Sequence, residues 1–242
     1  MRRKSGFTLI EMSIVLVIIG LIVGGILVGQ DLIASAAIRS QISQIERYNT
    51  AVNTFRNKYG YLPGDMPDPY ASQFGFSARG TFPGLGDGNG IIQGTSNVSG
   101  VSNCGFCETD GEVLLFWVDL SKAGLIDGSF SLGSATTLAT NITSSGIGTY
   151  IPPAKIGQNN SVYIWSGGSS NSYLGSGDGN NYFGISNVSA LGVANGFSLE
   201  STPGLTVKQA ANIDKKIDDG MPQAGKVMAW YINYDIQTAR PA

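Results

Sequence analysis

A single glutamate near the start of the chain occupies the position that most needs a chemical explanation. Glu11 is followed by an uncharged, mostly apolar run from Met12 to Gly29. A lone carboxylate in a hydrocarbon layer costs roughly 3 kcal/mol on insertion scales for comparable groups, so such residues commonly have a partner or a function. The chemistry that this position favours is pairing with an oppositely charged group in an apolar environment.

A closely spaced cysteine pair is the second candidate for chemistry. Cys104 and Cys107 are the only two cysteines and are separated by two residues. In an oxidising compartment they would form a structural disulfide, whereas lowered thiol pKa values would make them a redox-active pair. The surrounding Asn, Ser and Gly residues, without the strand–helix frame of a thioredoxin-like domain, favour the disulfide. Zinc is disfavoured, because two thiolates do not complete a tetrahedral site and the chain has no histidine.

Two glycine-rich acidic loops could bind a hard cation such as calcium. Segments 85–90 and 176–181 alternate Asp or Asn with Gly, like fragments of calcium loops, and the first offers oxygen ligands from Asp87 and Asn89. Neither segment contains the full ligand series with a closing glutamate. The alternative for each is a tight turn with solvated charges.

Three carboxylates gather near the end of a predicted helix in the C-terminal part of the chain. They belong to Asp214, Asp218 and Asp219. Negative charge at a helix C-terminus opposes the helix dipole unless a cation or a lysine compensates it. This group is therefore another candidate calcium site, with a solvated turn as the alternative.

The elements that position Glu11 begin with a basic leader and an apolar helix. Arg2, Arg3 and Lys4 precede the run 12–29, so the positive-inside tendency places the N-terminus in the cytoplasm and the rest of the chain across the membrane. A helix of that run spans about 27 Å, close to the thickness of a bilayer core. A cleaved secretory signal peptide is the alternative, but its apolar region is typically shorter and Glu11 interrupts the start of this one.

The segment from Gly6 to Glu11 resembles the cleavage and methylation site of type IV prepilins and type II secretion pseudopilins. The resemblance implies that prepilin peptidase cuts after Gly6 and that the new N-terminal residue, Phe7, is N-methylated. It also implies that Glu11 faces the α-amino group of a neighbouring subunit in a filament. Either charge left unpaired in a low-dielectric bundle is strongly penalised, so the pair would set the register of assembly.

The same resemblance implies a location, partners and a cofactor. The protein would be a single-pass bacterial inner-membrane protein with a cytoplasmic N-terminus and a periplasmic or extracellular head. Its partners would be other pilin-like subunits and the pilus or secretion assembly machinery. Because major pseudopilins bind calcium in a C-terminal loop, calcium is the cofactor to test at Asp214, Asp218 and Asp219.

The helix is predicted to continue beyond the membrane. Apolar residues recur at three- and four-residue steps as far as Tyr59, the pattern of an amphipathic helix, and Gly60 and Pro63 end it. We therefore expect a leader at 1–6, a membrane or filament-core half at 7–29, an amphipathic half at 30–59 and a head at 60–242.

The head is predicted to mix helices and strands. Helices are expected at 112–123 and 206–217, and residues 68–110 and 129–148 are rich in turn-forming residues. Short β-rich runs predict strands at 162–165, 182–185, 197–199 and 226–232. This order predicts an α+β, pilin-like fold in which a small antiparallel sheet in a loop-rich head packs on the long helix.

Composition narrows the function to a structural subunit. The formal charge is −2, and removing the three leader cations gives −5, which argues against nucleic-acid binding. Without histidine no Ser/His or Cys/His catalytic set can be built, so we expect no enzyme. The leading hypothesis is a subunit of a type IV pilus or a type II secretion pseudopilus. The alternatives are a membrane-anchored thiol–disulfide protein using Cys104 and Cys107, and a binding or adhesin subunit at a pilus tip.

Overall fold

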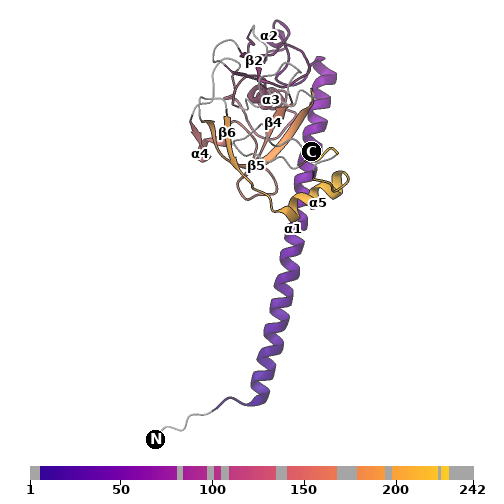
Figure 1. Cartoon of the computed structure of the whole chain (residues 1–242), viewed down its shortest axis with the longest axis vertical. Helices are drawn as coiled ribbons and strands as arrows, with labels where there is room; N and C mark the ends of the chain where they lie inside the picture. The colour runs from indigo at the N-terminus through magenta and orange to yellow at the C-terminus, as the bar shows by residue number, and fades with distance from the viewer. Residues whose placement is uncertain are drawn as a thin grey trace.

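One helix runs the length of the molecule, and a mixed head packs on its second half (Figure 1). The computed structural model describes residues 6–80, 84–96, 101–104, 109–134, 141–167, 179–193, 198–222 and 225–228. Helix α1 covers Leu9–Tyr59, 51 residues, or about 77 Å at the usual rise per residue. The sequence-based prediction of a continuous helix ending at Tyr59 is confirmed.

The two halves of α1 differ in what covers them. Ile38 is the first buried residue of the helix, and its side chain is only 3% exposed. Beyond it Tyr48, Ala51 and Phe55 are buried in the core of the head. The half before residue 30 projects alone from the head (Figure 1), and its Leu, Ile and Val side chains are exposed. The helix ends at Gly60, which adopts the left-handed conformation that glycine tolerates best.

A four-stranded antiparallel sheet forms one part of the head. The central strand β5, Asn181–Val193, pairs with β4, Asn160–Ser166, and with the two shorter strands β3, Ile142–Thr143, and β6, Ser198–Thr202. These strands contain the predicted runs at 162–165 and 182–185 and the described part of the run at 197–199. The fold class predicted from sequence, α+β and pilin-like, is confirmed.

A close packing contact explains one glycine in the sheet. Gly184 on β5 is the register partner of Tyr163 on β4. A Cβ atom at position 184 would lie 2.2 Å from Cζ of the Tyr163 ring. The ring therefore occupies the space that any other side chain would need.

Helix α3, Gly111–Lys122, lies in the middle of the head (Figure 1). Ten consecutive residues, from Gly111 to Leu120, are buried. Its Trp117 ring contacts Tyr48 of α1 edge-on, with 5.1 Å between the ring centroids. The helix buries the carboxylates of Glu112 and Asp119 together with its apolar residues.

The remaining elements are short. Helix α2 covers Tyr70–Gln73, strands β1, Gly94–Ser96, and β2, Val101–Cys104, form a two-stranded sheet, and helix α4 covers Ser144–Ile147. The sequence predicted only turn-rich segments in these regions. Helix α5, Val207–Ile217, begins after a Thr206 cap and confirms the predicted C-terminal helix.

The final predicted strand, 226–232, is wrong where the structure describes it. Residues 226–228 form a bend and a coil, and residues 229–232 lie outside the described part of the chain. The backbone N–H of Lys226 donates to the carboxylate of Asp218. That donor is therefore used in a local turn instead of in a sheet ladder.

Candidate functional site

The predicted processing segment lies at the free end of α1. Gly6, Phe7 and Thr8 precede the helix, and the Phe7 side chain is 80% exposed. Among the described residues beyond its chain neighbours, no atom would lie within 4 Å of a Cβ atom at position 6. The peptide bond between Gly6 and Phe7 is thus outside the helix and accessible, as cleavage by a peptidase requires.

Glu11 has a partner within its own chain. Its carboxylate accepts hydrogen bonds from the Thr8 backbone N–H at 2.7 Å and from the Thr8 hydroxyl at 2.8 Å. The Glu11 N–H donates in return to the Thr8 hydroxyl oxygen at 3.3 Å. This reciprocal capping box satisfies two of the donors that a helix N-terminus leaves unpaired. Sequence reasoning assigned Glu11 to an intermolecular pair and missed this local one, although the Thr-x-x-Glu spacing indicates it.

The helix that carries Glu11 meets the physical requirements of a membrane span. Within α1 an 18-residue window has a mean hydropathy of 2.8 and none of it is buried. By length and composition α1 can cross a bilayer. A cleaved signal sequence would meet the same requirement. The residues that distinguish a prepilin-type segment from such a signal are Gly6, Phe7 and Glu11.

The predicted cysteine pair is described only at one backbone position. Cys104 is the last residue of β2, and Cys107 lies outside the described residues. The disulfide between them stays a prediction.

The first acidic loop folds around two buried carboxylates that sequence reasoning did not single out. Asp65 and Glu112 are 1% and 0% exposed, and each can place an oxygen within 4.8 Å of the other and of exposed Asp87. The Asp87 carboxylate also accepts from the backbone and side-chain N–H groups of Asn89, at 3.0 and 2.9 Å. Of the corresponding loop at 176–181, residues 176–178 lie outside the described part of the chain.

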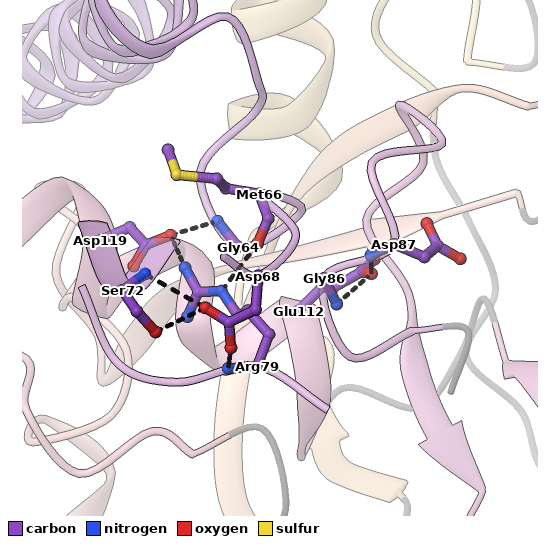
Figure 2. Close-up of polar contacts among 9 residues, drawn as sticks. All are labelled: Gly64, Met66, Asp68, Ser72, Arg79, Gly86, Asp87, Glu112 and Asp119. Atoms are coloured by element: carbon purple, nitrogen blue, oxygen red, sulfur yellow. Dashed lines mark hydrogen bonds and ion pairs between the residues drawn. The ribbon is translucent and has the colours of Figure 1, made fainter. Parts of the chain in front are cut away.

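Asp65 and Glu112 together anchor the backbone of this loop. Asp65 accepts from the N–H groups of residues 88, 89 and 90 at 2.8–3.2 Å. Glu112 accepts from those of residues 86, 87 and 93 at 2.8–3.3 Å, as Figure 2 shows for Gly86 and Asp87. Six backbone donors therefore converge on two carboxylates. We call this arrangement the carboxylate clamp.

Burial makes both carboxylates of the clamp weak acids. Desolvation, helped by the charge of Asp87, raises the pKa of Asp65 to about 7 despite the three backbone N–H groups. Desolvation and the nearby charge of Asp65 raise the pKa of Glu112 well above its ordinary value. The protonated form of each group is therefore favoured, because two ionised carboxylates this close also repel each other.

A second buried charge, Asp119 on α3, holds the segments on either side of α2. Its Oδ2 accepts from Nη2 of Arg79 at 2.5 Å and from the Gly64 N–H at 2.7 Å (Figure 2). The Arg79 and Asp119 side chains are both fully buried, and Nε of Arg79 donates to the Met66 carbonyl at 3.1 Å. Burial raises the pKa of Asp119, and the guanidinium of Arg79 opposes that rise.

The C-terminal acidic residues converge as well. Asp214, Asp218 and Asp219 each offer an oxygen within 4.8 Å of the others. Asp214 accepts from the Gly220 N–H at 3.2 Å and Asp219 from the Met221 N–H at 2.7 Å. Each of these bonds uses one oxygen of its carboxylate. Three carboxylates at the C-terminal end of α5 offer oxygen ligands of the type that a hard cation such as calcium prefers.

The comparisons with known proteins agree with the geometry at the N-terminus. Residues 1–27 match the family model described as the prokaryotic N-terminal methylation motif. No curated protein and no solved structure matches the chain. The matched segment contains Gly6, Phe7, Glu11 and most of the exposed apolar run. The chain therefore carries the prepilin-type cleavage and methylation signature, on a molecule with the long helix and α+β head of a pilin-like fold.

Proposed function

We propose that the protein is a prepilin-like structural subunit that is processed at Gly6 and assembled into a type IV pilus or a type II secretion pseudopilus. The observation that carries this proposal is the accessible Gly6–Phe7 bond at the tip of an exposed apolar helix, within a matched methylation motif. An apolar helix half of this size needs either lipid or neighbouring helices around it. Lipid surrounds this helix half while the subunit is anchored in the membrane, and neighbouring helices surround it after assembly.

The orientation of the chain in the membrane follows from the leader cations before the apolar run. The leader cations stay in the cytoplasm, and the head lies on the opposite side of the inner membrane. Cleavage after Gly6 removes these cations and creates one amine at Phe7. In a filament that amine pairs with Glu11 of a neighbouring subunit, because each charge would otherwise be unpaired in an apolar bundle.

Mass spectrometry of the mature N-terminus tests the processing step. We expect a first residue of methylated Phe7 in cells that contain prepilin peptidase, and an unprocessed chain in cells that lack it. A chain that keeps Met1 in the presence of the peptidase, or that begins near Gln30, would contradict the proposal.

Calcium is the cofactor that we propose for the C-terminal acidic cluster, supported by its three converging carboxylates. Calcium would offset the repulsion between them and raise the midpoint of thermal unfolding by mass action. Calorimetric titration of the purified chain tests this, with Asp218→Asn/Asp219→Asn as the variant. If calcium gives the same binding heat with the parent chain and with the double variant, calcium binds at a different site.

A further inference from the structure

Helix α5 lies at the end of the head that faces the apolar half of α1 (Figure 1). One contact shows which part of α1 lies beside it: Nζ of Lys208 is 3.7 Å from Oδ1 of Asp31. Asp31 is the first charged residue after Glu11 and comes two residues after Gly29, where the apolar run ends. The first turn of α5 therefore lies beside the point where α1 leaves the apolar layer.

The distance along α1 places this turn among lipid headgroups. Two residues of helix correspond to about 3 Å. The polar layer on each side of the hydrocarbon core is roughly 5–8 Å thick. When the run 12–29 spans the core, Val207 and Lys208 are thus at the level of the headgroups and not in open solvent.

The surface at that level has the chemistry of a membrane interface. The Val207 side chain is 87% exposed. Next to it the Lys208 side chain is 81% exposed. At the level of the headgroups an exposed apolar side chain can reach the acyl chains and an exposed lysine can reach the lipid phosphates.

A groove between α1 and α5 adds polar partners beside this turn. Its volume is about 310 Å³, and its lining includes Asp31, Ser35, Lys208, Gln209 and Asn212. The ammonium and amide groups can donate to a phosphate, and the carboxylate can accept from a headgroup amine. The ion pair between Lys208 and Asp31 is exposed, so little free energy is lost when its members bind other charges.

We propose that the first turn of α5 and this groove bind a phospholipid headgroup on the extracytoplasmic surface of the membrane. Lys208 contacts the lipid phosphate, and Val207 contacts the upper part of the acyl chains. The inference rests on the proposed function, because it needs α1 to span the membrane. The contact holds the head at a defined tilt on the bilayer until the subunit is extracted into a filament.

The test places an environment-sensitive fluorescent amino acid at one position at a time by nonsense suppression, which leaves Cys104 and Cys107 untouched. The full chain is reconstituted, one copy per nanodisc, in phosphatidylethanolamine and phosphatidylglycerol, with and without bromine atoms placed both high on the acyl chains and near their methyl ends. Position 207 is the test. Ile22, in the middle of the apolar run, reports insertion of α1, and Phe74, 54% exposed near α2, reports the solvent baseline.

The expected result is quenching by brominated lipid at positions 22 and 207 and none at 74. Quenching at 22, with position 207 as unaffected as position 74, would overturn the inference and leave the proposed function intact. Absence of quenching at 22 would overturn membrane anchoring itself, and the inference with it. One copy per nanodisc excludes contact with a second chain as the source of the signal.

A charge reversal tests the role assigned to Lys208. Lys208→Glu changes the charge by two units, and at about fivefold per unit near an anionic surface it should shift the equilibrium between lipid-bound and free α5 about 25-fold toward the free state. Quenching at position 207 should fall accordingly in phosphatidylglycerol-rich discs. Lys58→Glu is the matched control, because Lys58 is also exposed but lies at the far end of α1. Equal quenching in both variants would contradict a phosphate contact by Lys208.

Discussion

Glu11 shows how one residue can serve two partners in turn. In the single chain its carboxylate is held by the N–H and hydroxyl groups of Thr8. In the proposed filament the partner is the amine of a neighbouring Phe7. Assembly therefore exchanges a local hydrogen-bonded cap for an intermolecular ion pair, and the net gain is smaller than the value of pairing a bare charge.

We expect Glu11→Gln to separate insertion from assembly. The glutamine oxygen can still accept from Thr8, so the cap and the membrane insertion remain, but the charge needed for the intermolecular pair is gone. Processed subunit in the membrane fraction should be unchanged while sheared filament falls at least tenfold, a loss of about 1.4 kcal/mol or more per contact. Quantitative immunoblotting of both fractions measures this.

Thr8→Ser is the matched control for that experiment, because serine keeps the hydroxyl of the capping box. Wild-type filament yield from Glu11→Gln would show that the carboxylate has no role in assembly.

Arg79 and Asp119 form a buried ion pair, and replacing either residue alone should lower the free energy of unfolding. Arg79→Met leaves the Asp119 carboxylate buried with only the Gly64 N–H, and we expect a loss of about 3–5 kcal/mol in the free energy of unfolding. Urea unfolding of the full chain in detergent, followed by near-ultraviolet circular dichroism, measures the loss.

The double variant Arg79→Met/Asp119→Leu should recover part of that loss, since no unpaired charge is then buried. Additive losses in the double variant would mean that the two charges do not interact across α3 and the segment before it.

The carboxylate clamp makes the stability of its loop, an element of the head, depend on pH. The folded pKa of Asp65 is raised to about 7, and that of Glu112 is raised well above its ordinary value. The folded state therefore holds protons that the unfolded chain releases, and stability falls as pH rises from about 4 to 7. For Asp65 alone the loss is on the order of 4 kcal/mol across that window.

Unfolding of the full chain at pH 5 and at pH 8 tests this dependence. The chain should be more stable at pH 5, and Asp65→Asn should reduce the difference because asparagine does not titrate. A parent chain that is more stable at pH 8 would contradict the raised pKa values, unless added chelator removes the extra stability and so identifies a bound cation.

The elements differ in how far the sequence could predict them. The last residue of α1 could be predicted, because the apolar spacing stops at Tyr59 and both Gly60 and Pro63 indicate a helix end there. The predicted helix at 112–123 was nearly right in extent, but its apolar pattern did not reveal that Glu112 and Asp119 are buried as well. Their partners are backbone N–H groups and an arginine distant in sequence, and such contacts leave no local pattern.

The residues of the candidate sites could be predicted only where they lie close together in the sequence. Gly6, Phe7 and Glu11 lie within six residues and form a recognisable motif. Asp65 and Glu112 are 47 positions apart and meet only because the loop at 86–93 folds between them. The sequence-based prediction therefore included Asp87 as a possible ligand but not the two buried carboxylates beside it.

At the scale of the whole molecule, the boundary between the exposed segment and the folded head lies within α1 and not at the end of that helix. Deleting residues 1–29 should leave a folded, soluble head, because none of the described side chains at 6–29 is in the core. Deleting residues 1–59 should unfold it, because Tyr48, Ala51 and Phe55 belong to that core. Loss of one such aromatic alone costs about 3–5 kcal/mol.

Thermal unfolding and size-exclusion chromatography of the two truncated chains measure this difference. A chain lacking 1–36 is the control, since it stops just before Ile38, the first buried residue of the helix. A cooperative unfolding transition in the chain that lacks 1–59 would show that the head is independent of α1.

The junction between α1 and the head also determines how the molecule responds to tension. Gln44 donates to the Pro153 carbonyl and accepts from the Lys155 N–H, and Gln41 accepts from the Ile156 N–H. These side chains project sideways from α1, so a pull along the helix axis stretches all three bonds at once, in shear. Bonds strained in parallel share the force and must break together, whereas bonds that are peeled break one by one. The head is therefore attached in the geometry that best resists being pulled off along the direction in which a filament would be stretched.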